Sequence, residues 1–272
     1  MNDRTSHTCP GVLRDPGGDL AYLIRQMKAP RIAQAVSRVA EQARNESWSY
    51  EDFLAVLLDQ EVVARQAQGG EARIRAAHFP ARKTVEEFDF AYQVSVRQQV
   101  VLHLATLSFI EARDNVIFLG PPGTGKTHLA VALGMKACVA GHRVQFATAT
   151  QWVMRLAAAN HEKRLETYLR QLERTPLIII DEVGYIPFDA EAANLFFQLV
   201  SSRYERGSVI VTSNKPFTAW GEIFGDPVVA AAMIDRLVHH AEILSLKGDS
   251  YRLRDKKLTT PKARVVAQAV AE

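Results

Sequence analysis

A glycine-rich run near the middle of the chain has the residue types and order of a phosphate-binding loop. It follows the apolar residues 116–119, which we expect to form a buried strand, and a helical pattern of Ala, Leu and Val comes after it. In this context the glycines let the backbone wrap around a phosphate, the lysine places a positive charge near the β- and γ-phosphates of ATP, and the last threonine can bind Mg²⁺. The residues predicted to bind nucleotide are Gly120, Pro121, Pro122, Gly123, Thr124, Gly125, Lys126, Thr127 and His128.

Two carboxylates stand at the end of a second apolar run. Residues 177–180 are Leu-Ile-Ile-Ile, and Asp181 and Glu182 follow directly. In a parallel α/β sheet, ligands bind at this carboxyl end of the strands. We expect Asp181, together with Thr127, to hold hydrated Mg²⁺, and Glu182 to orient and polarise an attacking water. The alternative, a solvated acidic turn, is disfavoured by the glycine-rich loop upstream.

A third apolar run ends in Asn214. Its amide could hydrogen-bond the γ-phosphate or the lytic water, whereas the alternative is an ordinary turn asparagine. Lys126, Asp181, Glu182 and Asn214 are therefore candidate catalytic residues for the hydrolysis of ATP.

Apolar runs and helical patterns alternate through the part of the chain that holds these residues. We expect strands at residues 115–119, 143–147, 177–180, 208–212 and 242–246. Short apolar strands separated by helices predict an α/β fold in which a parallel five-stranded sheet lies between helices.

The N-terminal part shows helical spacing alone. Two patterns lie on either side of Pro30, and Ser49 can cap a third helix with Asp52 at the capping-box position. We therefore expect a small all-α domain before the α/β core. The predicted organisation is a flexible leader at 1–18, a helical domain at 19–80 that binds DNA or a partner, an ATPase domain at 81–258 and a flexible tail at 259–272.

The composition is that of an ordinary globular protein. The 272 residues are 47% hydrophobic and 23% charged, with a net charge of +3. The N-terminus lacks the apolar segment of a secretory signal, no apolar run is long enough to span a membrane, and Cys9 and Cys138 show no metal-ligand spacing. We expect a soluble, cytoplasmic protein without membrane partners. His239 and His240 are expected to pack rather than bind metal, and the His128 side chain to pack within its helix.

Several motifs together resemble one known family. They are GPPGTGKTHLA (120–130), IIIDEVGY (178–185), TSNKPF (212–217), MIDRLVHHAEIL (233–244) and KGDSYRLR (247–254), and residues 79–90 also fit. The chain resembles the IstB family of AAA+ ATPases, which help an insertion-sequence transposase and are similar to the DnaC helicase loader. The resemblance implies an AAA+ core over most of the chain, ATP and Mg²⁺ as cofactors, and an oligomer as the active form.

The resemblance also implies roles for two arginines. Arg236 matches the arginine finger, which would reach the γ-phosphate of ATP bound to a neighbouring subunit. Without the resemblance, an arginine in a helical stretch is more often part of a surface ion pair. Arg252 lies where the family would place a second phosphate sensor, and Arg254 competes for that role. Little chain follows, so the helical lid of larger AAA+ proteins is missing from the expected fold.

Basic residues gather in three stretches, at residues 28–44, 65–83 and 247–257. Such clusters can neutralise DNA phosphates, although solvated helix faces explain them equally well. With the resemblance, we expect largely sequence-independent binding to double-stranded DNA. A further candidate for DNA contact is the helical segment 148–175, for which a simple sheet-covering role is about as plausible.

Three functions compete. The leading one is an ATP-dependent DNA-binding ATPase that oligomerises on DNA and stimulates a cognate transposase, with hydrolysis that depends on the oligomer. A replicative helicase loader would use the same core with a different partner. A small-molecule kinase is disfavoured because the Asp181–Glu182 pair, Asn214 and Arg236 suit attack by water and catalysis between subunits.

Overall fold

The computed structural model describes residues 16–253 and divides the chain into two compact units between Gly69 and Gly70. Cys9, Arg254, the predicted tail at 259–272 and nearly all of the predicted leader lie outside the described residues. The division falls within a helix of the N-terminal part, α3 (Tyr50–Ala77), and residues 70–80 belong to the second unit by their contacts. None of the described helices combines the length and apolarity needed to cross a membrane.

The first unit is entirely helical, as its spacing predicts. It contains α1 (Pro16–Gln26), α2 (Pro30–Asn45) and the first part of α3. A small apolar cluster holds α2 on α3 through Ala35, Val39 and Leu57. The expected cap of α3 is present, because Ser49 Oγ accepts a hydrogen bond from the backbone N–H of Asp52 at 3.1 Å.

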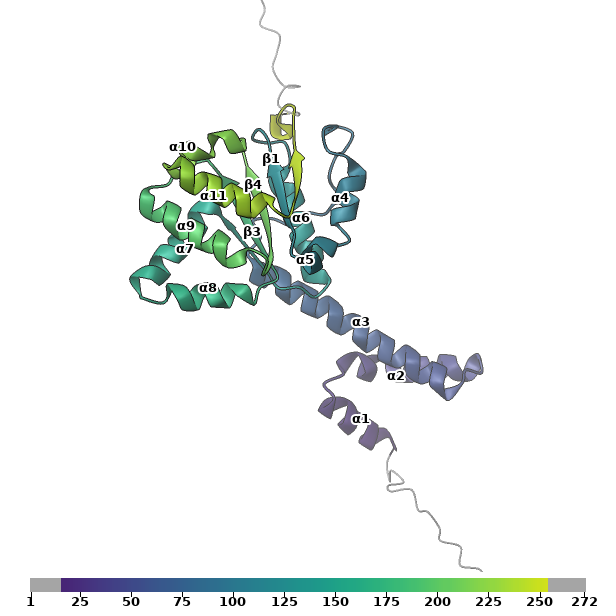
Figure 1. Ribbon diagram of the computed structural model, residues 1–272. Helices are drawn as coiled ribbons and strands as arrows, with labels where there is room; N and C mark the ends of the chain where they lie inside the picture. The colour runs from purple at the N-terminus through teal and green to yellow at the C-terminus, as the bar shows by residue number, and fades with distance from the viewer. Residues whose placement is uncertain (1–15, 254–272) are drawn as a thin grey trace, which may run out of the picture. The chain divides into compact units, whose positions relative to one another are not determined.

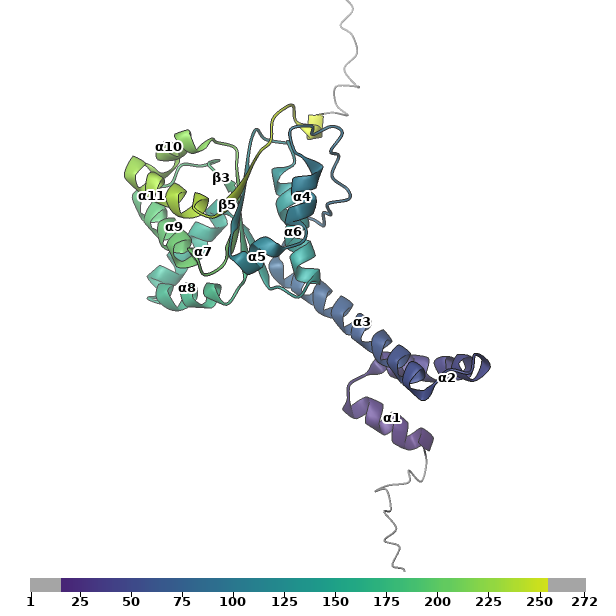
Figure 2. The same ribbon diagram turned by 45° about the vertical axis from the view of Figure 1, so that its right-hand side comes forward.

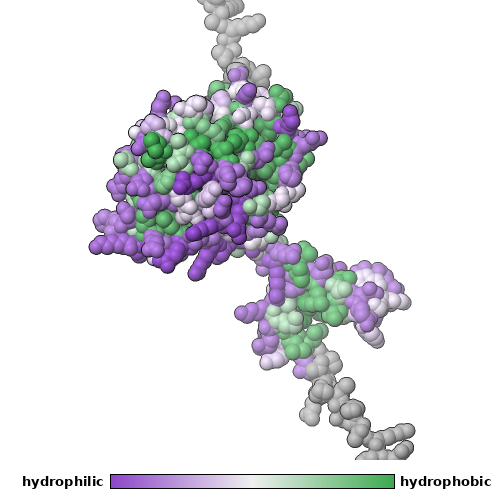
Figure 3. Space-filling view, in the orientation of Figure 1, coloured by the Kyte–Doolittle hydropathy of each residue, from purple (hydrophilic) through white to green (hydrophobic). Residues whose placement is uncertain are grey.

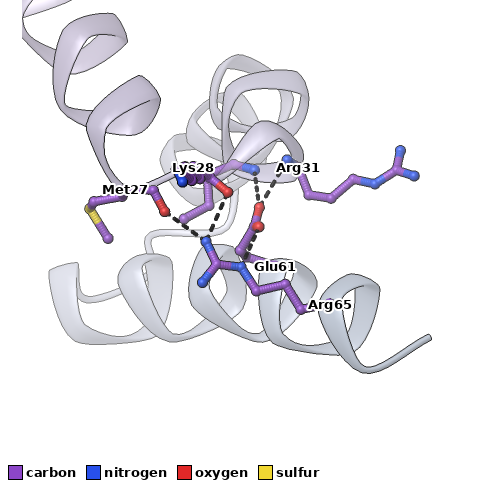
Figure 4. Close-up of polar contacts among 6 residues, drawn as sticks. Met27, Lys28, Arg31, Glu61 and Arg65 are labelled. Carbon is purple, nitrogen blue, oxygen red and sulfur yellow. Dashed lines mark hydrogen bonds and ion pairs between the residues drawn. The ribbon is translucent and has the colours of Figure 1, made fainter. Parts of the chain in front are cut away.

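A pair of charged residues on α3 connects α1 to α2 (Figure 4). Glu61 is buried and accepts hydrogen bonds from the backbone N–H of Arg31 at 2.9 Å and of Ile32 at 3.4 Å, at the N-terminus of α2. Arg65 donates to Glu61 at 2.9 Å and to the carbonyl oxygens of Met27 and Lys28 just after α1. The carboxylate thus serves the N-terminus of one helix, and the guanidinium the carbonyl end of the other, as the helix dipoles favour.

The second unit is built on a sheet of five strands, all of them parallel (Figure 1). Their order in the sheet is β2-β3-β4-β1-β5. The strands are β1 (Asn115–Leu119), β2 (Val144–Thr148), β3 (Leu177–Val183), β4 (Ser208–Ser213) and β5 (Ala241–Ser245). The predicted α/β fold with a five-stranded parallel sheet is confirmed. Because β4 lies between β1 and β3, the ends of all three strands meet at one edge.

Helices cover both faces of this sheet (Figure 2). Alternate residues of β1 show the two layers, since Val116 and Phe118 belong to one apolar core and Ile117 belongs to the other. One layer holds α4 (Gln98–Leu104), α5 (Ser108–Ala112) and α6 (Lys126–Val139). The other holds α7 (Ala149–His161), α8 (Leu165–Glu173), α9 (Ala190–Arg203), α10 (Trp220–Phe224) and α11 (Pro227–Val238). Two short 3-10 turns, η1 (Phe217–Ala219) and η2 (Tyr251–Leu253), complete the elements.

Candidate nucleotide-binding site

The loop between β1 and α6 has a conformation that depends on its glycines. Gly120 and Gly125 have φ angles of 148° and 100°, which side chains of L-residues rarely adopt. A Cβ atom on Gly120 would lie 2.1 Å from the carbonyl oxygen of Leu246, and one on Gly125 would lie 2.5 Å from the ring of Phe88. The loop therefore has both the backbone freedom and the tight surroundings that its sequence indicates.

Neighbouring strands hold the start of this loop. The backbone N–H of Gly120 donates to the carbonyl of Ser213, the last residue of β4, at 3.1 Å. On the other side, the N–H of Leu246 donates to the carbonyl of Leu119 at 2.7 Å. The hydrogen bonds of the sheet thus continue to the first residue of the loop.

Lys126 lies at the first position of α6 and is mostly buried, with 7% of its surface exposed. Its Nζ donates to the carbonyl oxygens of Gly120 at 2.7 Å and Pro121 at 2.8 Å. Burial lowers the pKa of this ammonium, and the nearby Asp181 carboxylate opposes that shift. The backbone N–H groups at the start of α6 add positive character, so this end of the helix suits an anion.

Asp181 links the end of β3 to the end of β4 and to the first turn of α6 through two hydroxyl groups. Thr127 Oγ1 donates to Asp181 Oδ1 at 2.8 Å, and Thr212 Oγ1 donates to the same oxygen at 2.5 Å. Thr212 also accepts the backbone N–H of Glu182 at 2.9 Å. Burial raises the pKa of Asp181, although the hydrogen bonds from Thr212 and Thr127 oppose the shift. Hydroxyl and carboxylate oxygens are the ligands that Mg²⁺ prefers, so Thr127 and Asp181 fit a magnesium site.

Sequence reasoning missed Thr212. The sequence places Thr212 at the end of an apolar strand and in the motif TSNKPF without a chemical role, yet it is buried and links Asp181 to Glu182. A hydroxyl at the carboxyl end of an otherwise apolar buried strand was the available signal, because a buried hydroxyl needs partners.

Glu182 is turned out of the strand by an irregularity. The pairing of β3 with β4 shifts register between Ile180 and Val183, and Glu182 has a φ angle of 63°. A bulge of this kind re-aims one side chain, and here it lets Asp181 stay buried while Glu182 lines an open cleft. Burial and then the charge of Asp181 raise the pKa of Glu182. A carboxylate with raised pKa is a better proton acceptor.

Asn214 follows β4 and lines the same cleft. Its Oδ1 atom is buried and has no hydrogen-bond partner within the described part of the chain. A buried amide oxygen without a partner favours a ligand or water as its missing donor. The predicted residues Lys126, Thr127, Glu182 and Asn214 thus surround one cavity of about 450 Å³, with Asp181 directly behind it.

A second group of lining residues comes from the segment before β1. Phe88, Tyr92 and Gln93 reach the cleft, and the ring of Tyr92 meets that of Tyr251 edge-on at 5.1 Å. The His128 ring packs against Phe88 and lies 2.8 Å from the carbonyl of Thr84, rather than within its own helix as we expected. Burial lowers the pKa of His128. The sequence signals for this wall of the cleft were the family resemblance of residues 79–90 and the aromatic residues ahead of the first strand.

Comparison with known proteins places the chain in a family. The family model described as IstB-like ATP binding protein matches residues 22–259. The chain belongs to the IstB-like ATP-binding family. An IstB-like relative from Pseudomonas aeruginosa, described as "Insertion sequence IS21 putative ATP-binding protein", is 46% identical over 88% of this chain and 90% of its own length. One from Geobacillus stearothermophilus, described as "Insertion sequence IS5376 putative ATP-binding protein", is 45% identical over 87% and 94%.

Solved structures show that this IstB-like protein has the AAA+ fold. AMPPCP-bound DnaA from Aquifex aeolicus superimposes with a TM-score of 0.53 at 19% identity, covering 66% of this chain and 55% of DnaA. DnaI superimposes with a TM-score of 0.52 at 15% identity, covering 61% of this chain and 91% of DnaI.

The two arginines singled out in the IstB-like motifs lie in different places. Arg252, in η2, lines the cleft, and its charge acts on both Lys126 and Glu182. Arg236, on α11, is not among the described residues that line it. The Arg236 guanidinium lies 4.9 Å from the centre of the Phe197 ring and donates to the carbonyl of Ala232 at 2.9 Å. The single chain therefore brings Arg252 to the candidate site and leaves Arg236 away from it.

His239 and His240 lie together just after α11 of this IstB-like chain. Their ring centres are 4.2 Å apart, and the hydroxyl of Tyr204 is 2.9 Å from His239 Nδ1. One ligand-type atom from each histidine and from Glu205 can be grouped within 4.8 Å, and all three residues are exposed. Three exposed groups at this spacing do not by themselves indicate a metal, and the packing role of both histidines stays a prediction.

Proposed function

We propose that this IstB-like protein hydrolyses ATP to ADP and phosphate and uses Mg²⁺ as cofactor. The observation that carries the proposal is the meeting of Thr127, Asp181 and Glu182 beside the glycine-rich loop, at the carboxyl edge of a parallel sheet. Asp181 is buried and hydrogen-bonded to Thr127, which suits it to hold Mg²⁺. Glu182, the next residue, faces the cleft, which suits it to act on water.

The loop and the start of α6 would bind the phosphates. Backbone N–H groups and the Lys126 ammonium offer positive charge to the β- and γ-phosphates. Mg²⁺, held by Thr127 Oγ1 and the Asp181 carboxylate, would neutralise charge on the phosphate oxygens. The Thr212 hydroxyl keeps the Asp181 carboxylate oriented for this task.

Glu182 and Asn214 would act on the attacking water. Glu182 accepts a proton from the water as its oxygen attacks phosphorus, and the raised pKa of the carboxyl favours that transfer. The buried Asn214 Oδ1 can accept the other O–H of the same water, which fixes its direction. The bulge that turns Glu182 into the cleft makes this division of roles possible.

The arginines would supply charge from two subunits. Arg252 can stabilise the phosphates of its own cleft, whereas Arg236, lying away from that cleft, would serve the cleft of a neighbouring copy. Hydrolysis would then depend on self-association of the chain. In nucleotide hydrolases that use an arginine finger, this residue accelerates hydrolysis roughly 10³-fold or more.

Glu182→Gln tests the hydrolytic role directly. The amide keeps the shape of the side chain but is a far weaker base, so we expect hydrolysis to fall by about 10²–10⁴-fold while ATP still binds. Glu191→Gln, an exposed change on α9, is the matched control and should hydrolyse ATP like the wild type. Hydrolysis by Glu182→Gln at the wild-type rate would overturn the role of Glu182.

We propose further that the protein acts on double-stranded DNA together with a transposase. The relatives' descriptions place them in insertion sequences, which move by transposition. The first unit has a groove between α2 and α3 with the exposed Arg31 and Arg38 on its wall, and basic residues such as Lys163 lie between α7 and α8. Figure 3 shows a largely hydrophilic surface over α8.

The apolar surface of the first unit supports a protein partner. Leu54, Leu58 and Val62 recur at helical spacing along α3, and each has at least 41% of its surface exposed. Such a stripe on a small helical unit is typical of a surface that another protein covers. The partner that we propose is the cognate transposase.

The salt dependence of DNA binding tests the groove. Arg31→Ala with Arg38→Ala should lower the slope of log affinity against log salt by about 2, because about one counterion is released per phosphate contact. Binding of a random duplex and of a defined target should weaken alike. Lys136→Ala, an exposed change on α6, is the control. An unchanged slope in the double variant would exclude the groove as a DNA contact.

A further inference from the structure

One buried polar side chain beside the phosphate loop has no part in the mechanism above. Gln93 has 5% of its surface exposed and comes from the segment before α4. Its Nε2 donates to the carbonyl oxygen of Thr124 at 3.1 Å, and its Oε1 accepts from Ser95 Oγ at 2.7 Å. Both ends of the amide are therefore in use.

The bond to Thr124 affects the direction of the next N–H group. A trans peptide is planar, and its C=O and N–H point to opposite sides. By holding the carbonyl of Thr124, Gln93 fixes the orientation of the N–H of Gly125, which directly precedes α6. Gly125 has a φ angle of 100°, and because glycine has no side chain, the hydrogen bonds that hold this conformation must come from other residues.

The same chain of bonds reaches the segment after β5. Ser95 Oγ accepts the backbone N–H of Lys247 at 2.9 Å. Four residues further on, the N–H of Tyr251 donates to the carbonyl of Gly123 in the phosphate loop at 3.0 Å, and Arg252 follows. The loop is thus attached twice to residues 247–252, once directly and once through Ser95 and Gln93.

We propose that Gln93 is a positioning residue of the nucleotide site. It orients the Thr124–Gly125 peptide for phosphate binding and, through Ser95, ties that peptide to the segment that carries Arg252. The proposal rests on the proposed function only in requiring that nucleotide binds in this cleft. It predicts that the Gln93–Ser95 relay sets nucleotide affinity while leaving the folded core unchanged.

Gln93→Met tests the role, because methionine keeps the length and bulk of glutamine and removes both hydrogen bonds. We expect the dissociation constant for MgATP, measured by calorimetry, to rise about 10-fold, as loss of one or two buried hydrogen bonds would produce. In turnover assays KM should rise while kcat at saturating ATP stays within about 2-fold, a split that merely weakened folding would not give. Gln99→Met makes the same chemical change at an exposed position of α4 and should leave both constants at wild-type values.

Ser95→Ala provides a second, milder variant. It removes the middle of the relay but keeps the bond from Gln93 to Thr124, so we expect about a 3-fold loss of affinity that does not add to that of Gln93→Met. Wild-type affinity in both variants would overturn the inference alone. A fall in the unfolding midpoint of the nucleotide-free protein that parallels the fall in affinity would also overturn it. Absence of MgATP binding by the wild type would instead overturn the proposed function, and this inference with it.

Discussion

At the scale of single residues, Asp181 shows a conflict between the charge that the proposed site requires and the burial of its carboxylate. Its carboxylate is buried to 3% exposure, and two threonine hydroxyls satisfy it, yet burial still raises its pKa. The folded state therefore binds a proton at Asp181 more tightly than the unfolded chain does. The buried carboxylate that suits Asp181 to the proposed magnesium site is in this way unfavourable for the stability of the nucleotide-free protein at neutral pH.

Asp181→Asn should separate these two effects. Because the folded-state pKa of Asp181 is raised, the free energy of unfolding should fall as pH rises from the ordinary carboxyl range through that raised pKa. In the asparagine variant this contribution disappears, so its unfolding midpoint at pH 7 should lie above that of the wild type, while hydrolysis falls by about 10²-fold or more. Thermal unfolding from pH 4 to 8 without nucleotide checks this, with Asp59→Asn as the exposed control. Parallel pH curves for Asp181→Asn and the wild type would contradict it.

The site also shows which residues could be recognised from sequence. Lys126, Asp181 and Asn214 were predictable because each follows an apolar strand or a glycine loop in a fixed local order. Thr212 and Gln93 were not, because their partners lie 31 residues away in the chain. Buried Arg203 was missed for the same reason, since it donates to the carbonyls of Leu172 and Thr175 across the fold.

At the scale of elements, the strands were predictable and their order was not. Strands buried on both faces are continuous apolar runs, so their positions could be read within about two residues for four of the five. The extension of β3 to Val183 escaped prediction, because a register shift places two carboxylates inside the strand. That β4 separates β1 from β3 depends on contacts between distant segments, which no local pattern contains.

In the helical unit, a residue of one helix caps the N-terminus of another. Helix α2 has Ala29 as its N-cap, with no side-chain hydrogen bond, and Glu61 of α3 performs the capping instead. Burial acts to raise the pKa of Glu61, but the hydrogen bonds from Arg65, Arg31 and Ile32 outweigh it and lower the pKa. A lowered folded-state pKa means a contribution to stability that is present above the ordinary carboxyl pKa and is lost as pH falls toward the folded-state value.

Glu61→Gln should loosen this unit selectively. The neutral amide keeps the shape but loses the charge that faces the start of α2, so we expect faster amide exchange at Arg31 and Ile32 and an unfolding midpoint for the helical unit about 5 °C lower. ATP binding in the second unit should be unchanged. Glu41→Gln, on the exposed side of α2, is the control. Unaltered exchange at Arg31 and Ile32 would show that the carboxylate does not cap α2.

At the scale of the whole molecule, the separation of Arg236 from the cleft has a direct test. Glu182→Gln keeps a normal Arg236, and Arg236→Ala keeps a normal Glu182, so each variant alone should be nearly inactive. Mixed in equal amounts, they should form interfaces in which one subunit supplies Glu182 and the other Arg236. Random mixing then predicts recovery of about a quarter of wild-type turnover.

The matched control for this mixture is the double variant, Glu182→Gln with Arg236→Ala in one chain, mixed with either single variant. It offers no interface with both intact residues and should recover nothing. Failure of the two single variants to complement, while each still assembles with ATP, would show that Arg236 does not act between subunits.

The hydrogen bond from Gly120 to Ser213 would give the proposed ATPase a way to distinguish ATP from ADP. Asn214 follows Ser213, so the residue that we propose to orient the attacking water and the loop that would hold the inner phosphates are joined through this one hydrogen bond. In the proposed reaction, departure of the terminal phosphate would leave Asn214 Oδ1 without its water, and this change would lie one peptide unit from Gly120. Release of ADP would then follow from loss of the terminal phosphate itself.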